Sequence, residues 1–523
     1  MKSIKIPCGV LLVFLFVNVG CRNQGSTDQK VVISEEKIEK VNFFIEEMIQ
    51  LQKIPGISLS ILSADTIVNI FKGKSDLDLK NPISENTIFP NGSISEVLVA
   101  IGVMRLVEMG KLSLDDPLIT HLPYFHLNGD GDHEKITIRM LLTHSSGLPN
   151  LSTYWDSSSK NDSALEVTTR SVRELELEFE PGTKHQKTFL DFDIAADLIA
   201  KASGMSFHAF MKTEVLEPLG MSQSFFELNE YNQSQLTRGH AFNSFADSIP
   251  SPYNYYPYNP EHAGSHGLQT NPSDLSGFIS LLMNEGRSGK KTVISPSLTK
   301  EYLRKQYKLN DGLYSALGWE ISTAGPTDVY HTEYNEDGYA AVMLYAPDQS
   351  LGIVLNSNLT LDYRPYEVAE NILFYLAGYS ESLPEIKIPV SKPMAGIYDH
   401  HGLDSALSYY INLVEEDIER YDKSINSLNL LVSHLFSVAT EENKEQKKED
   451  ILKTLDFIHT NFPKSPQPHI SSAEAYMIMG DSLQAVKSMD AALSVGEDDP
   501  SLEMRVQAMK EQLANNWRVS FFQ

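Results

Sequence analysis

The chain has 523 residues, of which 41% are hydrophobic and 21% charged, and this composition indicates a globular protein with more than one domain. Its 69 acidic and 43 basic residues give a formal net charge of −26. This charge argues against a nucleic-acid partner, because phosphate backbones are bound by a surplus of Lys and Arg. The acidic balance is instead expected to favour solubility.

The N-terminus has the pattern of a secretory signal. Lys2 and Lys5 precede an apolar run over residues 6–19, which is too short for a membrane-spanning helix. The run leads into Asn18-Val19-Gly20-Cys21, which resembles a bacterial lipobox, where the signal peptidase cuts before a cysteine that then carries lipid. Residues 1–20 are therefore predicted to be a lipoprotein signal peptide and residues 21–34 a polar tether.

Cysteine usage is consistent with this prediction. The chain has two cysteines, and Cys8 would leave with the signal, so the mature protein would hold only Cys21 and no internal disulfide. Lipidation of Cys21 would anchor the protein to a membrane of the cell envelope. Arg22 is unlike the Asp that marks inner-membrane retention in some Gram-negative bacteria, which favours the outer membrane. The alternative is ordinary secretion with a free cysteine.

Periodicity predicts the elements that follow. Apolar residues at helical spacing predict an amphipathic helix over residues 35–51, and residues 56–71 predict two strands around a turn at 63–65. A second helix is predicted over 94–109, and a middle region of helices and loops extends to about residue 304. The remaining elements are strands at 314–322, 328–334, 339–345 and 351–356, and a helix at 366–376.

This order of elements predicts the fold class α/β (α+β). One antiparallel sheet would be built from both ends of a domain spanning residues 35–383, with flanking N- and C-terminal helices and an inserted helical subdomain. The cleft between sheet and insertion is the default ligand site. Pro384, Pro389 and Pro393 predict a linker over residues 384–403.

Residues 404–523 predict a C-terminal all-α domain. Residues 432–462 predict a first, poorer helical repeat, and residues 473–493 predict one tetratricopeptide-like hairpin. So few repeats are expected to pack on the main domain rather than form an independent peptide-binding solenoid. The residues with the hairpin spacing are Ala473, Tyr476, Gly480, Ala485, Met489, Ala492 and Leu493.

Several segments resemble the serine β-lactamase and penicillin-binding-protein superfamily, and the nearest relatives look like class C β-lactamases, D-alanyl-D-alanine carboxypeptidases and related esterases. The resemblance implies the fold of that superfamily and a serine nucleophile at a helix start. His144, in one of these segments, is expected to support its loop through hydrogen bonds. The segments are residues 87–95, 110–117, 136–149, 181–183 and 266–274.

The first catalytic motif of the family is altered. Active members use Ser-x-x-Lys, in which the Lys helps to remove the serine proton. Here Ser93 is followed by Glu96 in the Lys position. Ser-x-x-Glu before an apolar helix is also a capping box, in which Ser93 caps the helix and Glu96 reaches back to it. The capping interpretation is favoured over a working nucleophile.

The other two motifs are altered as well. The Tyr-x-Asn motif of the family falls on residues 187–189, so Lys187 replaces the Tyr. The Lys/His-Thr/Ser-Gly motif falls on His331, Thr332 and Glu333, and the Glu in place of Gly would add bulk and negative charge where a substrate lies against the strand.

Two of these replacements would face each other. Glu96 and Lys187 take the positions of the family's Lys and Tyr, so we expect an ion pair that keeps Lys187 protonated and a poor base. A swapped arrangement, with Glu96 as the catalytic base, is the alternative; an ordinary Glu is a weak base for an alcohol.

No metal or other cofactor is predicted. Residues 128–132 resemble a calcium loop only slightly, because the Gly at the sixth position and the terminal Glu are missing. Asp399, His400 and His401 have no further ligands at metal-binding spacing and are predicted to lie in the linker.

Three functions are compatible with these observations. The first is a non-catalytic family member that binds a peptide, a cell-wall fragment or an envelope protein in its cleft. The second is an active serine hydrolase (an esterase, amidase or D-amino-acid peptidase) that uses Ser93 with assistance from His331. The third makes the helical tail a protein-docking part, with the remainder as its platform.

Overall fold

The structure of the protein is a computed structural model. It describes residues 33–514 except 64–65, 130, 151–162, 229–234, 243–249, 362–363, 417, 441 and 497–499. The predicted signal peptide, Cys21 and most of the predicted tether lie outside the described residues. Among the helices that are described, none combines the length and the apolar character needed to cross a bilayer.

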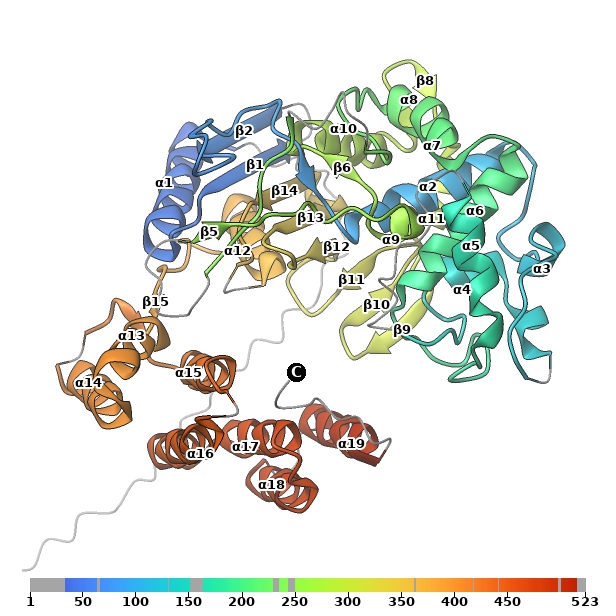
Figure 1. The fold of residues 1–523 in the computed structure, drawn as a ribbon. Coiled ribbons are helices and arrows are strands. Elements are labelled where there is room, and N and C mark those ends of the chain that lie inside the picture. The colour runs from blue at the N-terminus through green and yellow to red at the C-terminus, as the bar shows by residue number, and fades with distance from the viewer. Residues whose placement is uncertain are drawn as a thin grey trace, which may run out of the picture.

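An eight-stranded antiparallel sheet organises the first part of the chain, with the strand order β2-β1-β14-β13-β12-β11-β10-β9 (Figure 1). Strand β1 pairs with β14, from Ile57 opposite Ser357 to Ser63 opposite Leu351, so the sheet is built from both ends of the domain as predicted. The strands are β1 (Gly56–Ser63), β2 (Thr66–Gly73), β9 (Tyr307–Asn310), β10 (Leu313–Ser315), β11 (Glu320–Ser322), β12 (Val329–Tyr334), β13 (Ala340–Ala346) and β14 (Leu351–Ser357).

Helices α1 (Glu35–Gln52) and α12 (Pro365–Ala377) cover one face of this sheet (Figure 1). Their apolar residues, such as Ile45 and Leu373, join Leu59 of β1 and Val342 of β13 in one buried cluster. Both helices were predicted from the spacing of their apolar residues, and both are confirmed.

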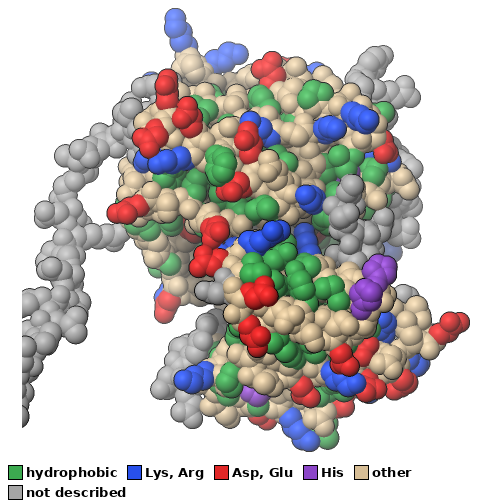
Figure 2. All heavy atoms as spheres, turned by 90° about the vertical axis from the view of Figure 1, so that its left-hand side faces the viewer, with side chains coloured by type: hydrophobic (Ala, Val, Ile, Leu, Met, Phe, Trp, Pro, Cys, Tyr) green, Lys and Arg blue, Asp and Glu red, His purple; other side chains and the backbone are tan. Residues whose placement is uncertain are grey.

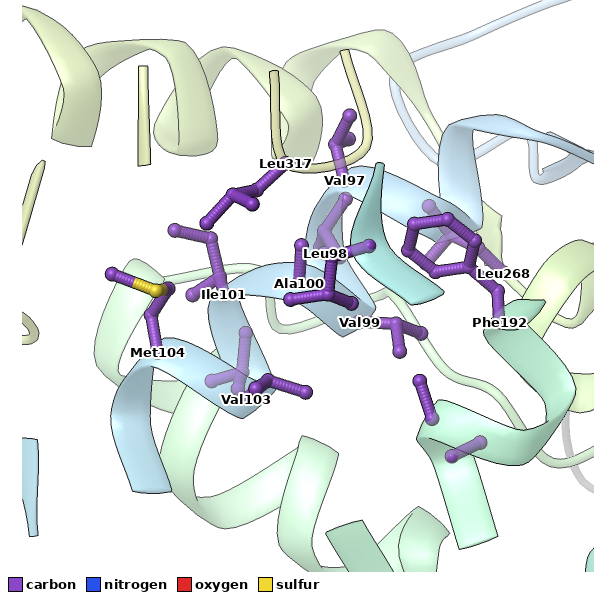
Figure 3. Packing of buried hydrophobic residues seen from close by; sticks show 14 of the residues in the cluster. Val97, Leu98, Val99, Ala100, Ile101, Val103, Met104, Phe192, Leu268 and Leu317 are labelled. Atoms are coloured by element: carbon purple, nitrogen blue, oxygen red, sulfur yellow. The ribbon is translucent and has the colours of Figure 1, made fainter. Parts of the chain in front are cut away.

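Helix α2 (Ile94–Glu108) lies in a second core, on the other side of the sheet. Val97, Leu98, Ile101 and Met104 point in different directions from the helix axis, and each is fully buried (Figure 3). A helix that is apolar all round must be enclosed on every side. Packing therefore fixes the place of the residues in its first turn.

The predicted helical insertion is present between β2 and β9. It packs on α2 through α6, α9 and α11 and on the sheet through α10. Its helices are α3 (Leu118–His121), α4 (Ile138–Leu142), α5 (Ala164–Ser171), α6 (Phe189–Ser203), α7 (Phe207–Phe210), α8 (Glu217–Leu219), α9 (Ala263–His266), α10 (Pro272–Met283) and α11 (Pro296–Tyr302). Its short strand pairs are β3 (Phe89–Pro90) with β6 (Gln269–Thr270), β4 (His240–Ala241) with β5 (Ser251–Pro252), and β7 (Arg287–Ser288) with β8 (Lys291–Thr292).

The C-terminal part is helical, with cores of its own. The predicted hairpin over 473–493 corresponds to the packed helices α17 and α18; its tetratricopeptide-like character stays a prediction. The elements are β15 (Ile388–Pro389), α13 (Ser391–His401), α14 (Leu403–Glu415), β16 (Tyr421–Asp422), α15 (Ile425–Ser437), α16 (Lys444–Asn461), α17 (Gln467–Ile478), α18 (Ser482–Val495) and α19 (Pro500–Ala514).

Two local predictions were wrong. The range 384–403 contains α13, whose Met394 belongs to the core of the tail, so it is not wholly a linker. Pro393 lies in the first turn of α13, where a missing N–H breaks no helical hydrogen bond. The single strand predicted over 314–322 is two strands, because Gly318 turns the chain with φ +78°.

Surface charge is spread out on the side of the molecule that carries α1, α13 and α14. Figure 2 shows acidic and basic side chains interspersed on this side, over both the sheet domain and the tail. The net charge is therefore not gathered there into one patch.

The loop that leads into α2 is fixed to the sheet by Asn91, which is fully buried. Its Nδ2 donates to the Phe89 carbonyl at 2.8 Å, and its Oδ1 accepts from Nδ2 of Asn356 on β14 at 2.9 Å. We expect Asn91→Ala to lower the free energy of unfolding by about 2 kcal/mol, because the buried amide of Asn356 loses its acceptor. Urea denaturation followed by tryptophan fluorescence measures this loss.

The matched control is Asn86→Ala. Asn86 is exposed, and its side chain accepts a hydrogen bond from Gln223. Its removal should change the free energy of unfolding by less than about 0.5 kcal/mol. Equal losses in the two variants would show that Asn91 is not an anchor.

Candidate active site

Ser93 immediately precedes α2 and is buried. Its backbone is helical (φ −60°, ψ −12°), and its side chain makes no capping hydrogen bond. Its carbonyl oxygen accepts from the Glu96 N–H at 3.1 Å and from Thr332 Oγ1 of β12 at 3.4 Å. The prediction that the Ser93 side chain caps the helix is therefore wrong, although the backbone places Ser93 beside the strand that carries the third motif.

The Glu96 carboxylate is buried in the first turn of α2, with 2% of its side chain exposed. Its Oε2 lies 3.4 Å from Lys187 Nζ and 3.6 Å from His144 Nε2, so the predicted Glu96–Lys187 ion pair forms. Its Oε1 has no hydrogen-bond partner among the described residues, so it does not reach back to Ser93. The two cations hold the carboxylate away from the helix terminus.

His144 contributes the second of these cations, and it lies in the loop after α4. Its Nδ1 is 3.0 Å from Oδ2 of Asp191, in the first turn of α6, and its ring centroid is 5.2 Å from that of Phe192. Its backbone is left-handed, with φ +52°, which is uncommon for a residue other than glycine. The expected hydrogen bond is present, but sequence analysis missed that the ring also faces Glu96.

Lys187 is held beside His144 by the backbone. The Gln186 N–H donates to the His144 carbonyl at 2.8 Å, and α6 begins at Phe189. The side chain of Lys187 is 41% exposed. The ammonium therefore contacts a buried carboxylate, while the side chain as a whole remains partly exposed.

The ion pairs determine the charges of this cluster. Burial opposes ionisation of Glu96, but the charges of Lys187 and His144 outweigh it and lower its pKa. Burial also opposes the charge on Lys187, and Glu96 and then Glu320 outweigh it and raise its pKa. In His144, burial is outweighed by Glu96 and Asp191, which raise its pKa to about 9. At neutral pH a carboxylate therefore lies between two cations.

Three further imidazoles near the site are neutral at pH 7. Burial lowers the pKa of His185 and of His266 to about 4, and that of His331 to about 3. Burial raises the pKa of Asp191 to about 6, but its carboxylate lies behind His144. An efficient general base has a pKa near the working pH and reaches the proton that it removes. None of these four groups has both a pKa near the working pH and a position from which it could accept the proton of Ser93.

The negative charge of Glu333, which replaces the glycine of the third motif, is balanced by the groups bonded to it. Its carboxylate accepts from Arg364 Nε at 3.0 Å and from the backbone N–H of Tyr366 at 2.9 Å, at the start of α12. An arginine and a helix N-terminus both compensate a carboxylate. The prediction of added negative charge against the strand is therefore corrected, since Arg364 balances that charge.

A cavity of about 230 Å³ lies between the first turn of α2, the segment before α6 and strands β11 and β12. Five of the predicted site residues line it; Ser93 is not among the lining residues. Among the described residues, no three His, Cys, Asp or Glu side chains are arranged to hold a metal ion. The lining residues are Glu96, His144, His185, Lys187, Ser315, Ala316, Gly318, Trp319, Glu320, His331, Thr332, Glu333 and Arg364.

The ion pair can be tested through stability. We expect Glu96→Ala to lower the free energy of unfolding by about 3 kcal/mol, because it leaves the buried His144 cation without one of its counter-charges. Lys187→Ala should cost about 1 kcal/mol or less, because the ammonium is partly in solvent. If urea denaturation gave wild-type stability for both variants, the ion pair would have no structural role.

The raised pKa of His144 predicts a pH dependence. Because its pKa of about 9 exceeds the ordinary value of 6.5, its contribution to stability is complete below pH 6.5 and is lost as the pH rises through 9. We expect the melting temperature of the wild type to fall between pH 7 and pH 9.5, through a loss of at most about 3 kcal/mol. His144→Gln removes this group, so a similar fall in that variant would contradict the assignment.

Comparison with known proteins identifies the family of this chain. The Beta-lactamase family model matches residues 42–373. Protein flp of Staphylococcus aureus is 25% identical over 334 residues, which cover 64% of this chain and 65% of that protein. The match thus spans just under two thirds of the length of that relative.

Two further relatives extend the comparison. A Beta-lactamase of Pseudomonas fluorescens is 25% identical over 350 residues, covering 61% of this chain and 92% of that protein. The octameric penicillin-binding protein homologue from Pyrococcus abyssi has a similar structure, with a TM-score of 0.58 and 25% identity over 68% of this chain and 81% of that chain. From the family match and the similar fold, this chain belongs to the beta-lactamase family.

Proposed function

We propose that this family member binds a ligand in the cavity beside Ser93 and does not hydrolyse it. The observation that supports this is Glu96 in the position of the catalytic Lys, paired with Lys187 and His144. A serine hydroxyl becomes nucleophilic when a neighbouring base accepts its proton. A carboxylate with a lowered pKa is a weak acceptor, and a protonated Lys187 has no lone pair to offer.

The proposed ligand is a peptide, a cell-wall fragment or a segment of an envelope protein. The cavity is smaller than the roughly 300–1,000 Å³ typical of drug-sized ligands, so one end of such a molecule would enter it. The similarity to a penicillin-binding protein homologue supports the cell-wall fragment. The polar lining supports recognition of charged or hydrogen-bonding groups.

The second candidate function is an active hydrolase with altered machinery. It is favoured by Ser93 itself and by Thr332 Oγ1, which lies 3.4 Å from the Ser93 carbonyl oxygen on the neighbouring strand. In that account Glu96 or His331 would serve as the base. The two functions differ in whether Ser93 forms a covalent adduct.

Intact-mass analysis decides between them. We expect the purified chain to show no adduct after incubation with a fluorophosphonate or with benzylpenicillin, because Ser93 lacks a base. The double variant Glu96→Lys/Lys187→Tyr restores two family side chains and should be acylated slowly by benzylpenicillin. The same double variant with Ser93→Ala is the control. A wild-type adduct that is absent in Ser93→Ala would overturn the binding function and establish the hydrolase.

We also propose that Cys21 carries a lipid that anchors the protein to the outer membrane of a Gram-negative cell. The sequence Asn18-Val19-Gly20-Cys21 after an apolar run supports this. In cells fed a labelled fatty acid, the wild type should carry label in the membrane fraction and Cys21→Ser should not. Label in both proteins would refute the assignment.

A further inference from the structure

Four residues that line the cavity each carry a buried polar side-chain atom without a hydrogen-bond partner among the described residues. Glu96 Oε1, His144 Nε2, Ser315 Oγ and His331 Nε2 have no hydrogen-bond partner among the described residues, although His144 Nε2 lies 3.6 Å from Glu96 Oε2, and all four residues line the cavity. Buried polar atoms in folded proteins are nearly always hydrogen-bonded. Four such atoms on residues that line one cavity therefore point to a polar ligand.

Charges of both signs face the same space. The acidic lining residues include Glu96, whose Oε1 has no hydrogen-bond partner among the described residues, and Glu320, whose charge also acts on Lys187. The basic lining residues include Lys187, whose side chain is partly exposed, and the buried His144. Glu333 and Arg364 also line the cavity, but they are already bonded to each other.

This arrangement discriminates between ligands by charge. A simple anion would be attracted by Lys187 and His144 but repelled by Glu96 and Glu320, and a simple cation would meet the reverse. A ligand with an ammonium and a carboxylate a few bonds apart satisfies both sets. Ser315 and the neutral His331 can exchange hydrogen bonds with an amide or carboxyl group between them.

The size of the cavity limits the ligand. Its volume of about 230 Å³ lies below the roughly 300–1,000 Å³ of sites that hold drug-sized ligands. An α-amino acid or a dipeptide of small residues fits this space. A longer peptide would extend out of the cavity.

We propose that the cavity binds a small zwitterion, a free α-amino acid or a dipeptide, through both its ammonium and its carboxylate. The inference rests on the proposed binding function and specifies its ligand. The ammonium is placed against Glu96 Oε1 and Glu320, and the carboxylate against Lys187 and His144. An N-acylated peptide or benzylpenicillin lacks the ammonium and leaves the acidic residues without a partner.

Calorimetric titration of the full chain at pH 7 tests the proposal, with D-alanine, L-alanine and D-alanyl-D-alanine as probes. N-acetylalanine removes the cation and alanine amide removes the anion. Each modification should weaken binding by roughly tenfold or more, because each removes a charge-assisted interaction.

Variants locate the two charges. Glu320→Gln should weaken binding of alanine by roughly tenfold and leave binding of N-acetylalanine unchanged, since only alanine presents an ammonium. Lys187→Gln should show the reverse selectivity: it should weaken binding of alanine and leave binding of alanine amide unchanged. Glu381→Gln changes an exposed carboxylate outside the cavity and should bind like the wild type.

The outcomes separate the two proposals. Equal affinity for alanine and N-acetylalanine would overturn the zwitterion while supporting a binding function of the cavity. If none of the five probes bound, the zwitterion proposal would be overturned, and the cavity would hold water or a different ligand. A covalent adduct on Ser93 would overturn the binding function itself.

Discussion

The buried carboxylate of Glu96 is the constraint on which the site depends. Helix α2 is enclosed on all sides, so a charge in its first turn cannot reach bulk water and must find counter-charges nearby. Lys187 and His144 supply them from two separate segments of the helical insertion. The packing of the insertion against α2 therefore also sets the charge state of the site, and a change in one would change the other.

The replacements at positions 96 and 187 make physical sense only as a pair. A lysine at position 96 would place two ammonium groups side by side, with Lys187 lowering the pKa of its neighbour. A tyrosine at position 187 would leave the buried Glu96 with His144 as its one cation. With both replacements the cluster is neutralised internally, and the basic group that would serve Ser93 is absent. The same pairing leaves Glu96 Oε1 without a hydrogen-bond partner among the described residues.

Sequence periodicity predicted α1, α2, α12 and most strands, because their apolar residues are buried on a fixed repeat. Motif spacing predicted that Glu96 meets Lys187. Predictions from local sequence failed where contacts with residues distant in the sequence determine the structure. The capping box before α2 is not formed, because the distant residues Lys187 and His144 attract the Glu96 carboxylate more strongly than the helix terminus does. The contact of His144 with Glu96 depends on a left-handed backbone at a residue other than glycine, which no periodicity reveals.

Ser93 has a structural explanation that does not require chemistry. Gly92 before it has φ +45°, and a Cβ there would lie 2.2 Å from the ring of Tyr334 on β12. The chain thus turns into α2 against the neighbouring strand, and Ser93 is buried in that turn with its carbonyl oxygen bonded to Thr332. A large side chain at position 93 would have to displace this packing, whereas a serine fits it. A small residue at this position therefore follows from the close approach of α2 to β12, and the charges around Glu96 carry the information about function.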